Sequence, residues 1–243
     1  MRKWVKGIAS MSTLDGRLAV VTGASRGIGR AIAVCFARAG ARVAGCSRGT
    51  HTDNFLDDLT GSQRNLCLHA TSDVRALGDI QRFRDQVQGT LGTPDIVVNN
   101  AGIVARQSAM TLSPETWNDV LASNLTGPFF VTQAFLPAMQ SRRAGRIINL
   151  ASIAGRAGTP MLSAYCAAKH GVVGLTRALA EELRGDSIVV NAICPGSVDT
   201  DMLKQGMPGG TPKMTADEVA RVALFLAADA PPALTGACID VFG

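Results

Sequence analysis

Short apolar runs alternate along most of the chain with longer segments whose apolar residues recur at helical spacing. Leu18–Thr22 is an apolar run rich in β-forming residues that stops at a glycine-rich turn, and Gly27–Ala39 then follows helical periodicity. The same pattern predicts further strands at Arg42–Cys46, Leu66–Ala70, Asp95–Asn99, Arg146–Leu150, Ile188–Ile193 and Ala237–Val241. Further helices are predicted at Val74–Gln88, from an N-cap at Ser113 toward Gln140, at Ser163–Leu183 and at Asp217–Ala228.

Strands and helices that alternate in this way form parallel βαβ units. We therefore expect an α/β protein with one doubly wound parallel sheet of about seven strands and helices on both faces. The 243 residues, 47% of them hydrophobic, suffice for one sizeable core. A single domain is expected at residues 14–243, after a disordered N-terminal arm at residues 1–13.

The N-terminal segment is basic with scattered apolar positions. Residues 1–10 are interpreted as a disordered arm, or as an upstream start ahead of a natural Met11. No apolar run is long enough for a secretory signal or a membrane span, so we expect a cytoplasmic protein that does not contact membranes.

Charge and metal-ligand residues narrow the function classes. The formal net charge is +5, but the 24 Lys and Arg residues are scattered, which disfavours nucleic-acid binding and suits an anionic cofactor. The six cysteines show no CxxC spacing, and none of the three histidines is spaced with Cys, Asp or Glu as in a metal cluster. No metal site is predicted.

The segment Thr22–Gly29 lies where a phosphate-binding turn is expected, between the first strand and its helix. Glycine lets the backbone turn tightly and approach a pyrophosphate, and the helix N-terminus offers free N–H groups with a positive dipole end. We therefore predict a dinucleotide cofactor held by Gly23, Ser25, Arg26, Gly27, Ile28 and Gly29.

The order TGxxxGxG at Thr22–Gly29, followed by NNAG at Asn99–Gly102, resembles the short-chain dehydrogenase/reductase family, and the resemblance runs from Leu14 to Gly243. It implies a Rossmann-type catalytic domain that binds a nicotinamide cofactor. Further cofactor contacts implied at matching positions are Asp73, Val74, Asn100, Ala101, Gly102, Pro195, Gly196, Val198 and Thr200.

The choice of nicotinamide cofactor is read after the second strand, where an acidic residue would bind the ribose of NAD and repel a 2′-phosphate. This chain has Ser47 and Arg48 there, and Arg26 offers a second cation. These residues favour NADP(H). Alternatively, Arg48 is a solvated loop residue and NAD binds without an acidic partner.

Tyr165 is the single tyrosine, and Lys169 follows four residues later on a predicted helix, so both project from one face. A nearby ammonium is expected to lower the phenol pKa and make Tyr165 a general acid in reduction and a base in oxidation. Ser152 follows the fifth strand, at the carboxyl edge where the active crevice opens, and can bind the substrate oxygen.

The family resemblance adds two roles. It implies that Lys169 also holds the nicotinamide ribose and that Asn124 completes a water-linked proton relay. The implied reaction is hydride transfer between NADP(H) and a carbonyl or secondary alcohol, with Tyr165 as proton donor. The alternative from another functional class is a sensor that binds NADP(H) without turnover. The complete set of Asn124, Ser152, Tyr165 and Lys169 argues against a sensor, which has no need for a proton relay.

The sequence specifies the substrate and the oligomeric state less closely than it specifies the reaction. The chain most resembles 3-oxoacyl-(acyl-carrier-protein) reductases, which implies an acyl-thioester substrate, with another small ketone or alcohol as the alternative. Residues 197–214 read as a short loop that either leaves the pocket open or closes over substrate, and Arg106 and Arg156 either face the pocket or are solvated. The resemblance implies a homotetramer, with a dimer as the alternative.

Overall fold

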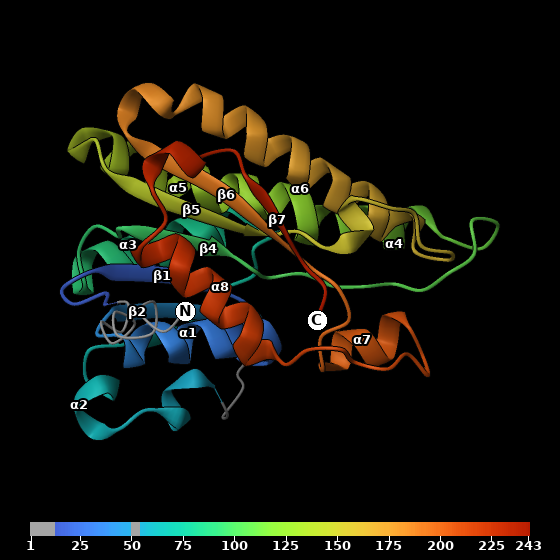
Figure 1. Cartoon of the computed structure of the whole chain (residues 1–243), viewed down its shortest axis with the longest axis horizontal. Coiled ribbons are helices and arrows are strands. Elements are labelled where there is room, and N and C mark those ends of the chain that lie inside the picture. Colours follow the sequence, from blue (N-terminus) through green and yellow to red (C-terminus); the bar gives the residue numbers. More distant parts are fainter. Residues whose placement is uncertain (1–12, 50–53) are drawn as a thin grey trace, which may run out of the picture.

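The computed structural model describes residues 13–49 and 54–243, so the predicted arm at residues 1–13 lies outside it except for Thr13. Seven strands form one sheet in the order β3-β2-β1-β4-β5-β6-β7, with every paired strand parallel (Figure 1). This confirms the predicted doubly wound α/β fold. The strands are β1 Leu18–Thr22, β2 Arg42–Ser47, β3 Leu68–Thr71, β4 Ile96–Asn99, β5 Gly145–Leu150, β6 Ile188–Pro195 and β7 Cys238–Val241.

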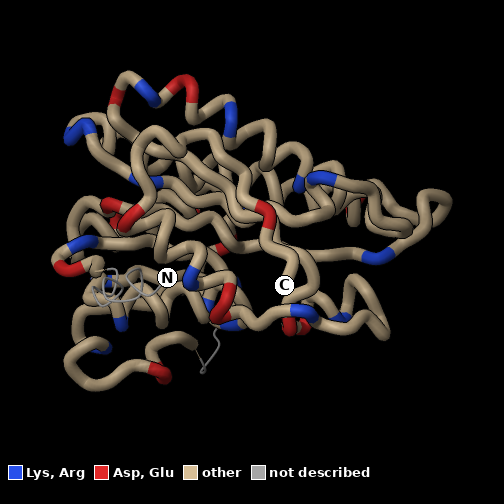
Figure 2. The backbone as a smooth tube through the Cα atoms, viewed as in Figure 1, with Lys and Arg blue, Asp and Glu red and all other residues tan. Residues whose placement is uncertain are grey.

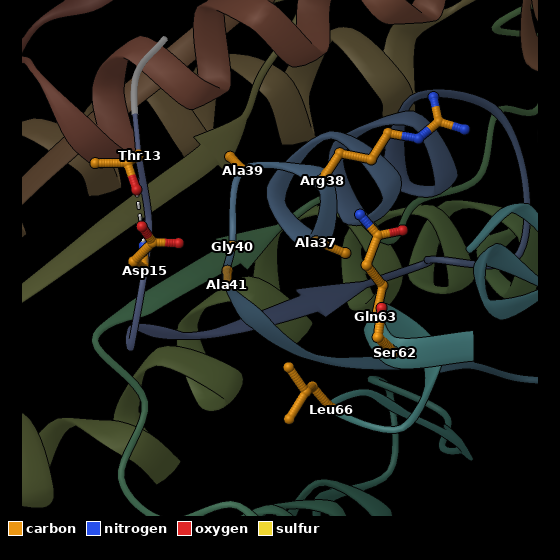
Figure 3. Close-up of a pocket in the computed structure, with 10 residues that line it drawn as sticks. All are labelled: Thr13, Asp15, Ala37, Arg38, Ala39, Gly40, Ala41, Ser62, Gln63 and Leu66. Atoms are coloured by element: carbon orange, nitrogen blue, oxygen red, sulfur yellow. Dashed lines mark hydrogen bonds between the residues drawn. The ribbon is translucent and has the colours of Figure 1, made fainter. Parts of the chain in front are cut away.

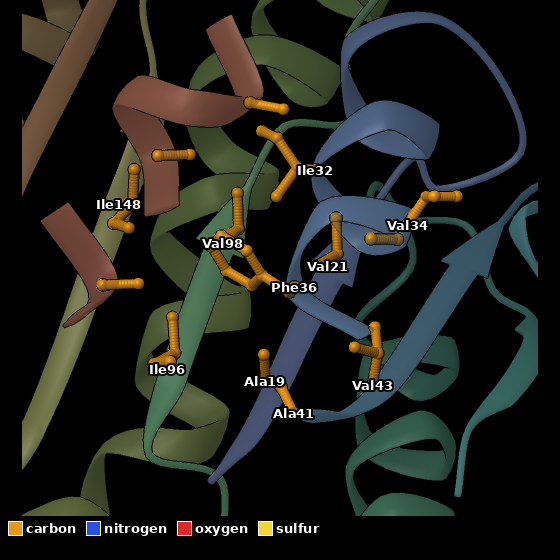
Figure 4. Packing of buried hydrophobic residues seen from close by; sticks show 14 of the residues in the cluster. Ala19, Val21, Ile32, Val34, Phe36, Ala41, Val43, Ile96, Val98 and Ile148 are labelled. Atoms are coloured by element: carbon orange, nitrogen blue, oxygen red, sulfur yellow. The ribbon is translucent and has the colours of Figure 1, made fainter. Parts of the chain in front are cut away.

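Helices cover both faces of the sheet (Figure 1). The side chains of β1 alternate, because successive residues of a strand point to opposite faces. Ala19 and Val21 pack with helices α1 and α8 (Figure 4), whereas Leu18 and Val20 pack with α3, α5 and α6. The helices are α1 Gly27–Arg38, α2 Gly61–Arg64, α3 Leu77–Thr90, α4 Pro114–Leu121, α5 Gly127–Arg142, α6 Ser163–Glu182, α7 Asp201–Gly206 and α8 Ala216–Ala228.

Several boundaries differ from the sequence prediction. β3 begins at Leu68 rather than Leu66, because Leu66 and Cys67 close a turn by donating their N–H groups to the carbonyls of Gln63 and Arg64. The helix predicted from Val74 begins at Leu77. The long helix predicted from Ser113 is divided into α4 and α5 by a π-helical turn at Ala122–Thr126.

Residues 197–214 are more ordered than the loop that the sequence predicts. They contain α7 and a parallel bridge between Val198 and Met214. Thr200 caps α7, since its Oγ1 accepts a hydrogen bond from the N–H of Leu203 at 3.3 Å.

The strand order reverses between β1 and β4, which are neighbours although β2 and β3 lie between them in sequence. In such a sheet the loops after these two strands diverge, leaving a crevice at the carboxyl edge. The glycine turn follows β1 and the NNAG segment follows β4, so the topology brings both to this crevice.

Candidate active site

The glycine turn adopts backbone conformations that side chains disfavour. Gly23 and Gly27 have φ angles of +70° and +55°. A Cβ at residue 29 would overlap the side chain of Asn100 and the carbonyl oxygen of Gly23. The turn is therefore a bare backbone cradle at the start of α1, as a bound pyrophosphate requires.

The NNAG segment fixes this cradle from the adjacent strand. Asn100 Nδ2 donates to the carbonyl oxygens of Thr22 and Gly23 at 2.9 and 3.2 Å. The backbone N–H groups of Asn100 and Ala101 both donate to Thr22 Oγ1 at 3.0 Å. Thus two predicted motifs lying far apart in sequence hold each other in place.

The end of β6 forms the other side of the crevice. Gly196 N–H donates to the carbonyl oxygen of Val241 at 2.8 Å, which aligns this segment with β7. The Thr200 methyl group lies against the glycine turn, 3.3 Å from the position that a Cβ of residue 27 would occupy. Pro195, Gly196, Val198 and Thr200 line one cavity together with Ile28 of the glycine turn.

This cavity, with a volume of about 120 Å³, also contains the predicted reaction centre. Ser152 and Tyr165 both line it, and they come from the loop after β5 and from α6. Its remaining walls are largely apolar, with Val104, Leu162, Met202, Leu203 and Met207 among them. The crevice thus places two hydroxyl groups in an otherwise apolar pocket beside the glycine cradle.

Tyr165 is 9% exposed. Burial raises the pKa of its phenol to about 12, and a hydrogen bond with Ser152 opposes this rise only in part. Ser152 Oγ accepts from the N–H of Ala154 at 3.1 Å, which orients the serine oxygen and leaves its own proton for donation. The cavity thus brings together the two hydroxyl groups that the sequence singles out.

Lys169 lies one helical turn after Tyr165 and is 5% exposed. Its Nζ donates to the carbonyl oxygen of Leu150 at 2.6 Å and lies 5.6 Å from the centre of the Tyr165 ring. Burial lowers the pKa of Lys169 to about 8. The expected lowering of the Tyr165 pKa by this ammonium is wrong for this structure, because burial of the phenol dominates and Nζ points to Leu150.

Asn124 is fully buried in the π-helical turn. Its Nδ2 donates to the carbonyl oxygens of Ile103 and Val120 at 2.9 and 2.8 Å, while Oδ1 has no partner in the part of the chain that the structure describes. A Cβ at residue 102 would overlap this Oδ1, so Gly102 leaves room for it. The Asn124 amide thereby holds the segment after NNAG.

The predicted adenosine end of the cofactor site lies at the carboxyl end of β2. Ser47 is nearly buried, and its Oγ lies 3.3 Å from His69 Nε2. Arg48 is exposed and its charge acts on Asp73, which pairs with Arg75 at 2.7 Å. Val74 is buried against Gly127.

Arg26 extends from the glycine turn toward α7. Its guanidinium lies 3.6 Å from the carboxylate of Asp201, with both side chains at least 70% exposed. An ion pair this exposed contributes little to stability. Arg26 therefore stays accessible beside the glycine turn.

Sequence reasoning missed the residues of α7 that close the cavity. Met202, Leu203 and Gly206 line it, and the hydroxyl of Tyr165 lies 3.9 Å from Met202 Sδ. The N-cap Thr200 followed by Met202 and Leu203 was an available helix signal, obscured by the glycines and prolines that follow.

The two arginines considered as pocket residues have different positions. Arg156 turns away from the pocket: Nε lies 2.9 Å from Asp240 Oδ1, and Nη2 donates to the carbonyl oxygen of Cys238. Arg106 lies at the rim, where Nη1 donates to the carbonyl oxygens of Pro160 and Gly206 at 3.3 and 3.2 Å.

A larger hollow of about 310 Å³ lies between the end of α1 and α2 (Figure 3). Its walls include Thr13, Asp15, Arg38 and Gln63, and none of the predicted site residues.

Within residues 13–49 and 54–243, no cluster of three or more His, Cys, Asp or Glu side chains could hold a metal ion. No helix in the described chain is long and apolar enough to cross a membrane. Basic and acidic positions are interspersed over the fold (Figure 2).

Comparison with known proteins identifies the family of this chain. A family model described as short chain dehydrogenase matches residues 17–208. The chain is 35% identical to the 3-oxoacyl-(acyl-carrier-protein) reductase FabG of Escherichia coli (strain K12), covering 94% of this chain and 97% of that protein. It is 37% identical to the FabG of Pseudomonas aeruginosa, covering 95% and 98%. Since the family match spans most of the chain and these relatives align nearly end to end, the chain belongs to the short-chain dehydrogenases and is an oxidoreductase of that family.

Proposed function

We propose that this chain is an NADP(H)-dependent carbonyl reductase in which Tyr165 transfers the proton. The observation that carries the proposal is that Ser152, Tyr165 and Ile28 of the glycine turn line the same cavity. A substrate carbonyl in this cavity would meet two hydroxyl donors beside the cofactor cradle. The catalytic unit is proposed to span residues 14–243.

The two hydroxyl groups are suited to reduction. With a pKa of about 12, the phenol of Tyr165 carries its proton at neutral pH, which is the form a general acid needs. Ser152 donates to the carbonyl oxygen and stabilises the negative charge that develops there. NADP(H), when bound, supplies or accepts the hydride.

Lys169 supplies positive charge behind Tyr165. At neutral pH the side chain is mostly protonated, since burial lowers its pKa only to about 8. This charge is available to hold the nicotinamide ribose. Asn124 supports the same site by fixing the segment that carries Val104.

The preference for NADP(H) rests on the last residue of β2 and the residue after it. Ser47 and Arg48 stand where an acidic residue would select NAD, and the exposed guanidinium of Arg48 suits a 2′-phosphate. Arg48→Ala should therefore weaken NADPH binding by about tenfold while leaving NADH binding nearly unchanged. Equal losses for both nucleotides in a fluorescence titration would contradict this choice.

The substrate class is drawn from the relatives. FabG proteins are named for 3-oxoacyl-(acyl-carrier-protein) reduction, and the apolar cavity walls at Val104 and Leu162 suit an acyl chain. A 3-oxoacyl thioester is therefore the first substrate to test, with other small ketones as the second.

A homo-oligomer is proposed, with a tetramer as the first expectation and a dimer as the second. Large apolar side chains are at least 37% exposed on two separate regions, Trp117 and Phe129 on α4 and α5, and Phe225 and Phe242 near β7. Light scattering on the purified protein would determine the number of subunits.

The central experiment compares wild-type protein with Tyr165→Phe in NADPH oxidation on acetoacetyl thioesters and simple ketones. We expect the variant to lose turnover by at least about a hundredfold while it binds NADPH nearly as tightly. If the variant keeps most of the activity, Tyr165 is not the proton donor. NADPH binding without turnover by the wild-type protein on any carbonyl would favour a sensor.

A further inference from the structure

Arg106 lies at the mouth of the cavity, in the segment that follows the NNAG motif. Val104, two residues earlier, is buried in the cavity wall, whereas the Arg106 side chain is exposed. Its Nη1 donates to Gly206, which itself lines the cavity on the α7 side. The guanidinium therefore lies on the rim between α7 and the loop before α6.

The partners of Arg106 differ from those of the other two arginines near this crevice. Arg26 faces the carboxylate of Asp201, and Arg156 faces that of Asp240. Among the described residues, the hydrogen-bond partners of Arg106 are the carbonyl oxygens of Pro160 and Gly206, both reached through Nη1. Within the described part of the chain, no hydrogen bond uses its Nε or Nη2, so its charge and a planar pair of N–H groups remain for a ligand.

The neighbouring segments do not compensate this charge. Residues 101–112 contain no acidic residue, and neither do residues 152–162 on the facing side. Residues 197–214 carry two acids and two lysines, and of these Asp201 lies 3.6 Å from Arg26 and 4.0 Å from Lys204. The mouth of the cavity is thus locally positive at Arg106.

We propose that Arg106 is a specificity-determining residue that binds an anionic oxygen group of the substrate at the mouth of the cavity. The chemistry recognised is a carboxylate or a phosphate carried by the carbonyl compound, held in bidentate fashion by the guanidinium. This inference rests on the proposed reductase function, because it concerns substrates of that same site. It also links substrate binding to α7, since the guanidinium already contacts Gly206.

The test uses substrate pairs that share a ketone and differ in charge. Acetoacetate is compared with ethyl acetoacetate, and acetoacetyl-coenzyme A with the acetoacetyl thioester of N-acetylcysteamine. For Arg106→Gln, the ratio of the KM of the anionic member to that of the neutral member should rise about tenfold in at least one pair. A rise with acetoacetate identifies a carboxylate, and a rise with the coenzyme A ester identifies a phosphate.

Arg143→Gln is the matched control, because Arg143 is also exposed and donates to a backbone carbonyl, that of Gly185, at the opposite edge of the sheet. Its KM ratios should equal those of the wild-type protein. Added salt should raise the KM of the anionic substrate in the wild-type protein and much less in Arg106→Gln.

The assignment is overturned if the KM ratios of Arg106→Gln are unchanged in both pairs. It is also overturned if KM rises equally for the neutral and the anionic member, because a contact that only positions α7 affects both members alike. Failure of the proposed reductase function would look different. The wild-type protein would then turn over no member of either pair, or Tyr165→Phe would turn over its substrate at the wild-type rate.

Discussion

The hydroxyl of Tyr165 lies 3.9 Å from the sulfur of Met202, so a side chain of α7 occupies the space next to the proposed proton donor. The cavity around them is about 120 Å³, which is small for a substrate in contact with a cofactor. Met202 therefore borders the space that a substrate would occupy, and methionine has the rotamer freedom to shift when that space is filled.

Shortening Met202 should widen the range of ketones accepted. In Met202→Ala, the kcat/KM of a bulky aryl ketone relative to that of acetone should rise about tenfold, because the side chain nearest the Tyr165 hydroxyl is removed. Met110→Ala is the control, since Met110 is 97% exposed and does not line the cavity. An unchanged ratio in Met202→Ala would mean that α7 does not limit substrate size.

The glycine cradle should not tolerate a methyl group at residue 29. A Cβ there overlaps Asn100 and the carbonyl of Gly23, so Gly29→Ala should lower the free energy of unfolding by about 1–3 kcal/mol and weaken NADPH binding. Urea unfolding and fluorescence titration measure the two effects. Gly89→Ala in α3 meets no atom within 4 Å and should be neutral or stabilising, by up to about 1 kcal/mol.

The rate of ketone reduction should fall above pH 8. A lysine is charged below its pKa, and burial lowers the pKa of Lys169 to about 8, so its positive charge is lost as the pH rises through that value. Tyr165 keeps its proton over this range, because burial raises its pKa to about 12. The kcat/KM of a neutral ketone, measured from about pH 6 to about pH 10, should show this descending limb.

Lys169→Arg separates this explanation from others. Arginine stays charged over the same range, so the descending limb should disappear from whatever activity the variant retains. A limb at the same pH in the variant would assign the titration to another group.

A buried polar network between β4, β5 and α6 should contribute measurably to stability. Asn99 Nδ2 donates to Asn149 Oδ1, and Asn149 Nδ2 donates to Thr176 Oγ1, both at 2.9 Å. Thr176→Val keeps the shape but leaves the Asn149 amide without this acceptor, which should cost about 1–3 kcal/mol of unfolding free energy. Thr211→Val at an exposed position should change it by less than about 0.5 kcal/mol, with both variants measured at one protein concentration.

The elements that sequence predicted well are those whose signal is local. The apolar run at Leu18–Thr22 and the glycines after it define β1 and the phosphate turn without reference to the rest of the chain. Likewise, the spacing of Tyr165 and Lys169 places both on one face of α6, where the structure brings the lysine Nζ within 5.6 Å of the ring centre.

The features that sequence could not give depend on distant partners. Arg156 faces Asp240, 84 residues later, and nothing near Arg156 in sequence indicates that contact. The pKa of Tyr165 is governed by burial under segments from several parts of the chain, so the spacing to Lys169 alone suggested the opposite direction. The π-helical turn at Asn124 is similarly invisible, because the periodicity of α4 and α5 continues through it.

β7 touches both halves of the proposed reaction centre. Val241 accepts the N–H of Gly196 in the proposed cofactor segment, Phe242 packs on that glycine, and Asp240 binds Arg156 four residues after Ser152. The edge strand β7 and the residue after it thereby hold in place both the segment at Gly196 and the loop that carries Ser152. A purification tag or immobilising linker fused after β7 will disturb these contacts directly. Activity measurements on this protein are therefore best made with such attachments at the other end of the chain.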